Sequence, residues 1–244
     1  MELTKIYGIH ALEEAITANM TIAKIYVQQD NQNNKIQKLL QHCSSLGATV
    51  SYTPIEKLNK LSKGGNHQGI VATISPIEFL SLEELIGNAL TTSTTPVFLL
   101  LDQISDVRNF GAIIRSASAA NVSGIIIQKK GGAPINADTV KTSAGTIFNM
   151  PICKVDHIKD AIFHLQAENI PTIAATEKTE TTVYQADLTK AFALVLGSEG
   201  RGINPSVLKM CDQHVSIPIA KQVDSLNVSV ACAVILFEAV RQRI

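Results

Sequence analysis

The sequence has no tryptophan, few other aromatic residues and no excess of charge of either sign. Aromatic residues make up 5% of the 244 positions, and 21 basic residues balance 21 acidic ones. A formal net charge of zero argues against a polybasic protein that binds nucleic acid without specificity, although a local basic surface could still bind RNA. Hydrophobic residues make up 45% of the chain, so it can form a core and is not wholly disordered.

Arginine and cysteine are also sparse, and their positions are informative. No arginine precedes Arg108. Because arginine suits bidentate phosphate contacts, this skew favours phosphate chemistry in the second half of the chain, although compositional chance in a lysine-rich genome explains much of it. The cysteines form no C-x-x-C pair and lack the spacing to histidine of a zinc site, so we expect reduced, partly buried thiols and no metal. They are Cys43, Cys153, Cys211 and Cys232.

No segment has the pattern of a signal peptide or of a membrane span. The first residues lack a basic start followed by an apolar run. The longest mostly apolar stretch, 228–237, is too short to cross a bilayer. We therefore expect a soluble cytoplasmic protein.

The chain divides into two segments of different character. Residues 1–76 are expected to form a small α/β domain, and residues 77–96 a linker with one amphipathic helix over 81–90. Ser81 and Glu84 have the spacing of a capping box at the start of that helix, and the Thr-rich run 91–96 marks the boundary. In the first domain the patterns predict helices over 6–16 and 34–46 and strands over 22–27, 49–52 and 70–74.

Residues 97–244 alternate short apolar runs with helical patterns. This alternation favours an α/β domain with a parallel sheet that is covered on both faces. The predicted strands are 97–101, 124–127, 170–174, 192–196 and 214–219, and the predicted helices are 110–120, 157–168 and 205–211.

Three stretches of this second domain carry candidate chemistry. The first, 102–117, follows a strand and opens a helix that Asp106 or Asn109 could cap. Arg115 lies in that helix among small and apolar residues. Either it reaches a cleft, or its side chain extends along the surface to solvent, and the pattern alone favours neither.

The second stretch, 194–205, is a buried strand followed by a glycine-rich turn that contains Glu199 and Arg201. Its G-x-x-G-x-G spacing differs from the G-x-G-x-x-G of dinucleotide-binding proteins, which argues against a nicotinamide dehydrogenase. The glycines either let the backbone approach a ligand closely or form a tight structural turn.

The third stretch, 224–237, contains a helix that Ser225 or Asp224 could cap and that is apolar on nearly all sides. A helix of this kind is buried on all sides. One face can cover the sheet, and a second copy of the chain is the simplest partner for the other. A homodimer is therefore expected.

The three stretches contain motifs that resemble those of a known family. N-F-G-A-I-I-R-S-A, L-V-L-G-S-E-G-R-G-I and S-L-N-V-S-V-A, in this order, resemble the SPOUT methyltransferases of the TrmH type. The N-terminal Y-G-I-H-A-L-E-E-A-I and N-H-Q-G-I-V-A are similar to the RlmB subgroup, which methylates a guanosine ribose 2′-OH in 23S ribosomal RNA. The resemblance covers nearly the whole chain.

The resemblance implies a fold and a cofactor. The C-terminal domain would contain a deep trefoil knot, an exception to the rule that chains avoid knots. The N-terminal domain would resemble the ribosomal L30e-type RNA-binding fold. The functional unit would be a homodimer with its active site near the interface. S-adenosylmethionine would be the cofactor, bound chiefly near Leu196, Gly197, Ile217 and Leu226.

The resemblance also implies catalytic roles. Arg115 would be the central residue, and since a guanidinium is effectively always protonated, we expect it to act as an electrostatic clamp on the target phosphate and the developing oxyanion rather than as a base. Asn109 would hold the ribose or orient Arg115. Glu199 would fix Arg115 or accept a hydrogen bond from the substrate. Ser225 and Asn227 would shape the pocket, unless they only cap the helix.

Four residues are candidates for RNA contact. His67 could bind RNA by stacking or hydrogen bonding or could stabilise its turn. Lys129 and Lys130 could contact phosphate, or could lie in a solvated loop. Arg108 is the fourth.

Other functions stay open on the sequence alone. A transfer-RNA enzyme with the same catalytic domain, an antibiotic-resistance methylase and a non-catalytic RNA-binding relative are the alternatives. The separate N-terminal domain favours ribosomal RNA, and the intact motif residues favour an enzyme.

Overall fold

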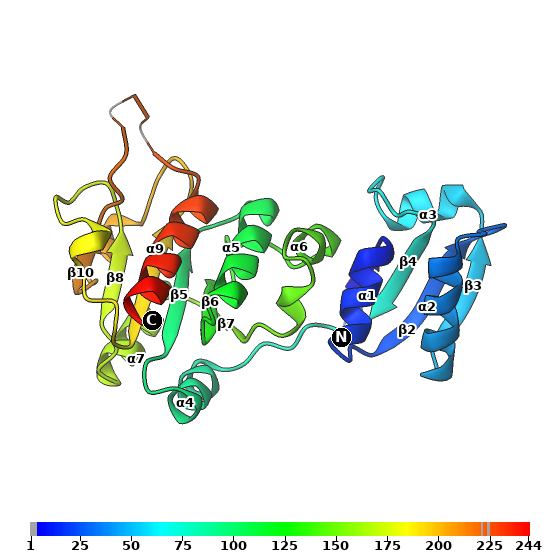
Figure 1. The fold of residues 1–244 in the computed structure, drawn as a ribbon, viewed down its shortest axis with the longest axis horizontal. Coiled ribbons are helices and arrows are strands. Elements are labelled where there is room, and N and C mark those ends of the chain that lie inside the picture. Colours follow the sequence, from blue (N-terminus) through cyan, green and yellow to red (C-terminus); the bar gives the residue numbers. More distant parts are fainter. Residues whose placement is uncertain (1–3, 221, 224) are drawn as a thin grey trace. The chain divides into compact units, whose positions relative to one another are not determined.

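The computed structural model describes residues 4–220, 222–223 and 225–244, which form two compact units. Unit 1 comprises the described residues up to Glu78 together with Ile135–Asn149. Unit 2 comprises Phe79–Pro134 and Met150–Ile244. Both units are of the α/β class, as the sequence predicts (Figure 1).

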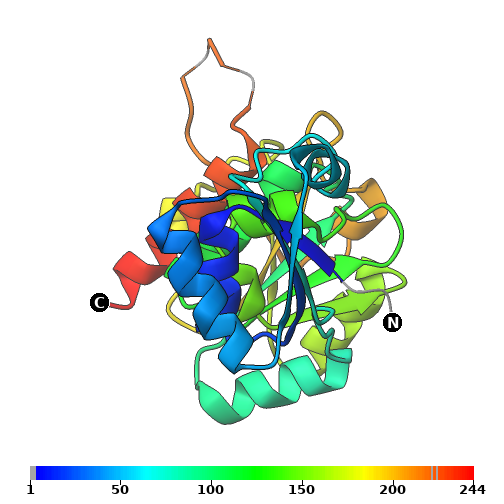
Figure 2. The ribbon, with the colours of Figure 1, turned by 90° about the vertical axis from the view of Figure 1, so that its right-hand side faces the viewer.

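Unit 1 is built on a mixed four-stranded sheet in the order β1-β4-β2-β3. β4 is antiparallel to β1 and β2, and β2 is parallel to β3. Helices α1 and α2 lie side by side (Figures 1 and 2). The elements are β1 (Thr4–Tyr7), α1 (Ile9–Thr17), β2 (Ile22–Gln28), α2 (Asn34–Ser45), β3 (Thr49–Thr53), α3 (Ile55–Leu61) and β4 (Ile70–Ile74).

The predicted strands of unit 1 are confirmed, but the start of the first predicted helix is wrong. Thr4–Tyr7 form β1, and α1 begins only at Ile9. Gly8 separates them with a φ of 91°, a backbone conformation that glycine adopts without steric cost. The short β1 has no periodicity long enough to distinguish it from a helical turn.

Unit 1 also contains a segment that the sequence-based boundaries place in the second domain. This segment carries α6 (Ala137–Thr142) and the 3-10 helix η1 (Thr146–Phe148). The Tyr7 hydroxyl donates a hydrogen bond to Oδ1 of Asp138 at 2.7 Å. Burial and the neighbouring carboxylate raise the pKa of Tyr7 to about 12. A contact so distant in the sequence has no local signal, so periodicity could not reveal it.

Unit 2 is built on a six-stranded sheet in the order β10-β8-β9-β5-β6-β7, and all neighbouring strands are parallel. Every residue of β5 is buried, as expected for a parallel strand that is covered on both faces. The strands are β5 (Val97–Asp102), β6 (Gly124–Gln128), β7 (Ile152–Val155), β8 (Thr172–Ala175), β9 (Phe192–Gly197) and β10 (Gln213–Val215).

Two helices cover each face of this sheet. Phe98 and Leu100 of β5 share one buried cluster with α4 and α7. The alternate residues of the strand point to the other face, where α5 and α9 pack side by side (Figure 1). The helices are α4 (Leu82–Thr92), α5 (Val107–Ala119), α7 (Ile158–Ala167), α8 (Pro205–Leu208) and α9 (Val228–Gln242), with a 3-10 helix η2 (Val183–Gln185).

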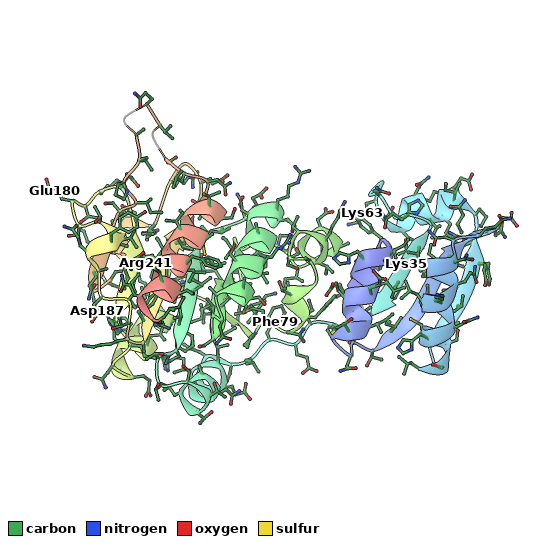
Figure 3. All side chains as sticks on the ribbon, viewed as in Figure 1. Lys35, Lys63, Phe79, Glu180, Asp187 and Arg241 are labelled. Atoms are coloured by element: carbon green, nitrogen blue, oxygen red, sulfur yellow. The ribbon has the colours of Figure 1, made fainter. Side chains whose placement is uncertain are left out.

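Hydrogen bonds hold the C-terminal end of α9. Arg241, labelled in Figure 3, donates two hydrogen bonds to the carboxylate of the buried Glu238, and Gln242 donates a third. These bonds lower the pKa of Glu238 to about 2. The carboxylate is therefore buried with its charge compensated.

Helix α4 belongs to unit 2, although the sequence predicts a linker over 77–96. The helix begins with the predicted capping box of Ser81 and Glu84. Its apolar face, including Leu85, joins the core of unit 2. A Cβ atom at Gly124 would lie 2.7 Å from Cδ1 of Leu85, so helix and strand are in direct contact. Figure 2 shows α4 along its length, at the bottom. The chain leaves unit 1 at Glu78, before this helix.

Among the described residues, no helix is both long and apolar enough to cross a membrane. All four cysteines are free and buried. The trefoil knot that the family resemblance implies stays a prediction.

We predict that Leu85→Ala lowers the free energy of unfolding of the full chain by about 2–5 kcal/mol, the usual cost of a large-to-small change in a core. Leu90→Ala, in the same helix but at a partly exposed position, is the matched control and should cost little. Denaturant unfolding followed by circular dichroism measures both. Equal, small effects would mean that α4 is only a tether.

Candidate active site

The side-chain amide of Asn227 connects three loops at the carboxyl ends of the strands of unit 2. Its Nδ2 donates to Oδ1 of Asn109 at 2.9 Å and to Oε1 of Glu199 at 2.7 Å. Its Oδ1 accepts hydrogen bonds from the backbone N–H and the hydroxyl of Ser229, at 2.9 and 2.6 Å. One amide group therefore joins the start of α5, the loop after β9 and the start of α9.

Asn227 is also the N-cap of α9. The prediction that Ser225 caps this helix is wrong, and Asp224, the other candidate, lies outside the described residues. Ser225 instead lines the pocket described below. Asn227 thus caps α9 and also contacts the start of α5 and the loop after β9. Capping alone, one of the roles that the sequence suggested, therefore does not describe this residue.

The first loop is held by a second cap. Oδ1 of Asp106 accepts a hydrogen bond from the backbone N–H of Asn109 at 2.8 Å, so Asp106 is the N-cap of α5. Asn109 then lies in the first turn of the helix, where its side chain is free to meet Asn227. The capping residue therefore determines which side chain faces the other two loops.

The glycine-rich loop after β9 returns tightly on itself. A Cβ atom at Gly197 would lie 2.0 Å from the carbonyl carbon of Gly202, so only glycine fits at this position. The N–H of Gly202 donates to the carbonyl of Ser198 at 2.9 Å, and Gly200 and Gly202 both have positive φ. The tight structural turn considered from the sequence is therefore present, and it exposes Glu199 at its tip.

A buried carboxylate fixes the far end of this loop. Oδ2 of Asp102, at the end of β5, accepts a hydrogen bond from the backbone N–H of Asn204 at 2.7 Å. Asp102 is only 2% exposed, and burial raises the pKa of its carboxyl group. β5 and β9 are neighbours in the sheet, so this bond joins the end of β5 to the loop that follows β9.

A pocket of about 590 Å³ lies beside these loops. Its volume is in the usual range for small-molecule sites, roughly 300–1,000 Å³. Glu199, Ser225 and Asn227 line it, as do all four residues predicted to contact a cofactor, which are Leu196, Gly197, Ile217 and Leu226.

The segment 175–178 also lines this pocket, and the sequence analysis missed it. It contributes Thr176 and Glu177 directly after β8. Ligands of parallel sheets bind outside the carboxyl ends of the strands. The residues that follow a predicted buried strand were therefore the signal that could have identified this segment.

Arg115 lies apart from this pocket in the single chain. Its side chain is exposed on α5, and it is not among the described residues that line the pocket. Six helical positions separate it from Asn109, which places the two side chains about 120° apart around the helix axis. The sequence allowed Arg115 either to reach a cleft or to extend along the surface to solvent. In the single chain its side chain is exposed to solvent.

The candidate RNA-contact residues differ in their availability. His67 is 8% exposed, and its ring nitrogens contact Oδ1 of Asn59 and the N–H of Gly69, each at 3.0 Å. Its stacking on RNA is therefore not supported, and the turn-stabilising interpretation holds. Lys129 forms an ion pair with Asp156 at 2.9 Å, which lowers the pKa of that carboxyl group.

The two remaining candidates, Lys130 and Arg108, have exposed side chains. Lys130 lines a second hollow of unit 2, and Arg108 lies in the first turn of α5. Both positions leave the cationic groups open to solvent, where an external anion can reach them.

The arrangement in unit 2 is that of a ligand-binding α/β domain, with a parallel sheet and a pocket at the carboxyl ends of its strands. Residues 96–237 match the SpoU rRNA Methylase family, and residues 5–80 match the family described as RNA 2'-O ribose methyltransferase substrate binding. The chain belongs to the SpoU rRNA methylase family.

Relatives along the whole chain agree with this membership. The 23S rRNA (guanosine-2'-O-)-methyltransferase RlmB of Vibrio vulnificus is 34% identical over 240 residues, covering 98% of this chain and 97% of the relative. A crystal structure of an RNA 2'-O ribose methyltransferase is 26% identical, with a TM-score of 0.79, and the match covers 98% of this chain and 88% of that one.

A second solved structure shows the likeness of fold alone. The AdoMet-bound rRNA methyltransferase from Sinorhizobium meliloti has a TM-score of 0.82 at 22% identity. The match covers 99% of this chain and 88% of that one.

We predict that Asn227→Asp destabilises the protein at pH 8 and that the effect becomes smaller as the pH falls. The new carboxylate still caps α9, but it faces Glu199 at hydrogen-bonding distance, so its pKa rises above the unfolded value. The electrostatic destabilisation is full above that raised pKa and fades as the pH falls from it to the unfolded pKa of an Asp. We expect roughly 1 kcal/mol, because solvent screens these partly exposed groups.

Thermal unfolding between pH 4 and 8 measures this effect. Asn33→Asp at the N-cap of α2 is the control, because it exchanges one good cap for another. An Asn227→Asp variant as stable as that control at every pH would contradict the role of the Asn227–Glu199 bond.

Proposed function

We propose that this protein transfers a methyl group from S-adenosylmethionine to the ribose 2′-OH of a guanosine in 23S ribosomal RNA. The observation that carries the proposal is the junction at Asn227, which brings the three family motifs together beside the pocket. The activity named for the RlmB relatives supports it, because their similarity extends over both units.

The pocket has the chemistry that a nucleoside cofactor requires. Leu196, Ile217 and Leu226 supply apolar walls for a base, and Gly197, Gly200 and Gly202 supply backbone N–H and carbonyl groups that no side chain of their own covers. Thr176 and Glu177 add polar groups that can accept hydrogen bonds from ribose hydroxyls. When bound, S-adenosylmethionine supplies the methyl group as an electrophile.

The residues of the chain then have to position the 2′-OH and stabilise its oxygen as the proton leaves to solvent, to which Glu199 and Asn227 are exposed. A guanidinium stays protonated at neutral pH, so Arg115 acts as a fixed positive charge on the target phosphate and the developing oxyanion. Asn109 and Glu199, held by Asn227, orient the ribose and accept hydrogen bonds from it. Ser225 borders the same space.

We also propose that the active unit is a homodimer formed through α5 and α9. Val230 and Phe237 leave an exposed apolar stripe on α9, and Arg115 is exposed on the neighbouring helix. A two-fold contact would cover the stripe with an identical one. It would also let Arg115 of one protomer approach the pocket of its partner, which accounts for its absence from the described pocket lining of the single chain.

Unit 1 is proposed to recognise the ribosomal RNA. Its residues up to Glu78 lie within the part of the chain that matches the substrate-binding family, residues 5–80. Its presence favours ribosomal over transfer RNA as the substrate. Arg108 of unit 2, exposed near the motif residues, is proposed to contact RNA phosphate. Such an enzyme acts in the cytoplasm, where its RNA is made.

We predict that Arg115→Ala lowers methyl transfer by about 10²–10³-fold, the usual cost of removing one transition-state charge contact, and leaves the Kd for S-adenosylmethionine within a few-fold.

Cells that lack the protein are complemented with wild type or variant, and ribose methylation is mapped along 23S RNA. Calorimetry with S-adenosylmethionine and with NAD identifies the cofactor. Methylation unchanged in cells without the protein would refute the proposed function.

We predict that Phe237→Glu breaks the dimer and reduces methyl transfer. Phe237 is 48% exposed, whereas the adjacent Leu236 is 2% exposed and belongs to the core, where a charge would test folding instead of dimerisation. Phe163→Glu, at an exposed apolar position on α7, is the matched control. Sedimentation at micromolar concentration gives the mass, and an active 26 kDa wild-type monomer would refute the dimer.

A further inference from the structure

A second hollow of unit 2 shares a wall with the large pocket. Ser198, Glu199 and Arg201 line both spaces, so the tip of the glycine-rich loop separates them. The second hollow measures about 570 Å³. Its other lining residues are Gln103, Ser105, Lys130 and Gly131.

The charges around this hollow favour an anion. Lys130 and Arg201 are its two cations, and Glu199 is the only acidic residue among the described residues that line it. The amide of Asn227 already donates to that carboxylate. Asp156 does not line the hollow. Lys130 lies near enough to help lower the pKa of the Asp156 carboxyl group, but that carboxylate accepts its hydrogen bond from Lys129.

The two adjacent lysines therefore differ in what they can bind. The ammonium of Lys129 lies 2.9 Å from Oδ2 of Asp156. Within the described part of the chain, neither Lys130 nor Arg201 has a carboxylate within ion-pair distance. Both side chains are exposed, so their positive charges are available to an external ligand.

The backbone of the hollow is open to close approach. Gly131 has a φ of 81°, and apart from the glycine and its chain neighbours no heavy atom lies within 4 Å of the place where its Cβ would be. Ser105 adds a hydroxyl that can donate a hydrogen bond. Two free cations, a hydroxyl donor and an unobstructed glycine suit a phosphodiester, which proteins bind with these groups.

We propose that this hollow binds the RNA phosphodiester next to the nucleotide that is methylated, with Lys130 and Arg201 as its cationic contacts. This rests on the proposed function. Glu199 then stands between the methyl donor in one space and the RNA backbone in the other. The target ribose is joined to that phosphate, so it is brought to Glu199, the carboxylate that accepts a hydrogen bond from Asn227. Phosphate contacts of this kind set the register of the RNA and do not read its sequence.

Lys130→Gln and Lys129→Gln form a matched pair that tests the proposal. Both remove one positive charge at adjacent positions, but only the first charge faces the hollow. Each full-length variant is titrated with a 23S RNA transcript between 50 and 200 mM salt. The Kd for S-adenosylmethionine is measured separately by calorimetry, and methyl transfer gives KM and kcat.

We expect Lys130→Gln to raise the KM for RNA about 5–10-fold and to flatten the dependence of log K on log salt by about one phosphate contact. The Kd for S-adenosylmethionine and kcat should change less than two-fold. Lys129→Gln should leave the slope unchanged. Arg201→Gln should alter both RNA and cofactor affinity, since Arg201 lines both spaces.

Equal effects of the two lysine variants, or an unchanged salt slope in Lys130→Gln, would overturn the subsite. Failure of the proposed function has a different signature. In that case the wild type transfers no methyl group to ribosomal RNA, while the salt slopes for RNA binding still report whether Lys130 contacts a phosphate.

Discussion

The site depends on the two-sided hydrogen bonding of one primary amide. Nδ2 of Asn227 donates to two loops, while its Oδ1 caps α9. A carboxylate could cap the helix but not donate, and a hydroxyl has only one proton to donate. Asparagine is the short side chain that meets all of these requirements. Asn227 therefore couples the positions of Asn109, Glu199 and the pocket rim to the start of α9. The buried face of that helix packs in unit 2.

The parallel sheet makes this coupling possible. Asp102 and Asn204 are 102 positions apart in the sequence, yet neighbouring parallel strands deliver the loops that follow them to the same edge. Gly197 permits the loop after β9 to return against itself, and Asp102 holds its far end. The loop is restrained at both ends, so Glu199 is presented at a defined place between the pocket and the second hollow.

The packing of α9 and α4 shows what an apolar pattern in a helix can predict and what it cannot. The apolar run of α9 indicates that both of its faces need cover, but it does not say which residues face the sheet. The tertiary structure places Leu236 in the core and leaves the adjacent Phe237 half exposed. Likewise, the pattern of α4 predicts an amphipathic helix with its cap, whereas only packing against Gly124 shows that the helix belongs to unit 2.

The sequence by itself determined the class of each unit and most strands and helices, because hydrophobic periodicity is a local property. The resemblance of its ordered motifs to a known family pointed to Leu196, Gly197, Ile217 and Leu226 of the pocket lining, but not to the segment 175–178. It left undecided which candidate residues are accessible. Burial of His67, the ion pair of Lys129 and the openness of Lys130 depend on neighbours remote in the chain or on the path of a turn. The insertion of 135–149 into unit 1 and the meeting of three loops at Asn227 were likewise decided by tertiary structure, since long-range contacts leave no trace in local periodicity.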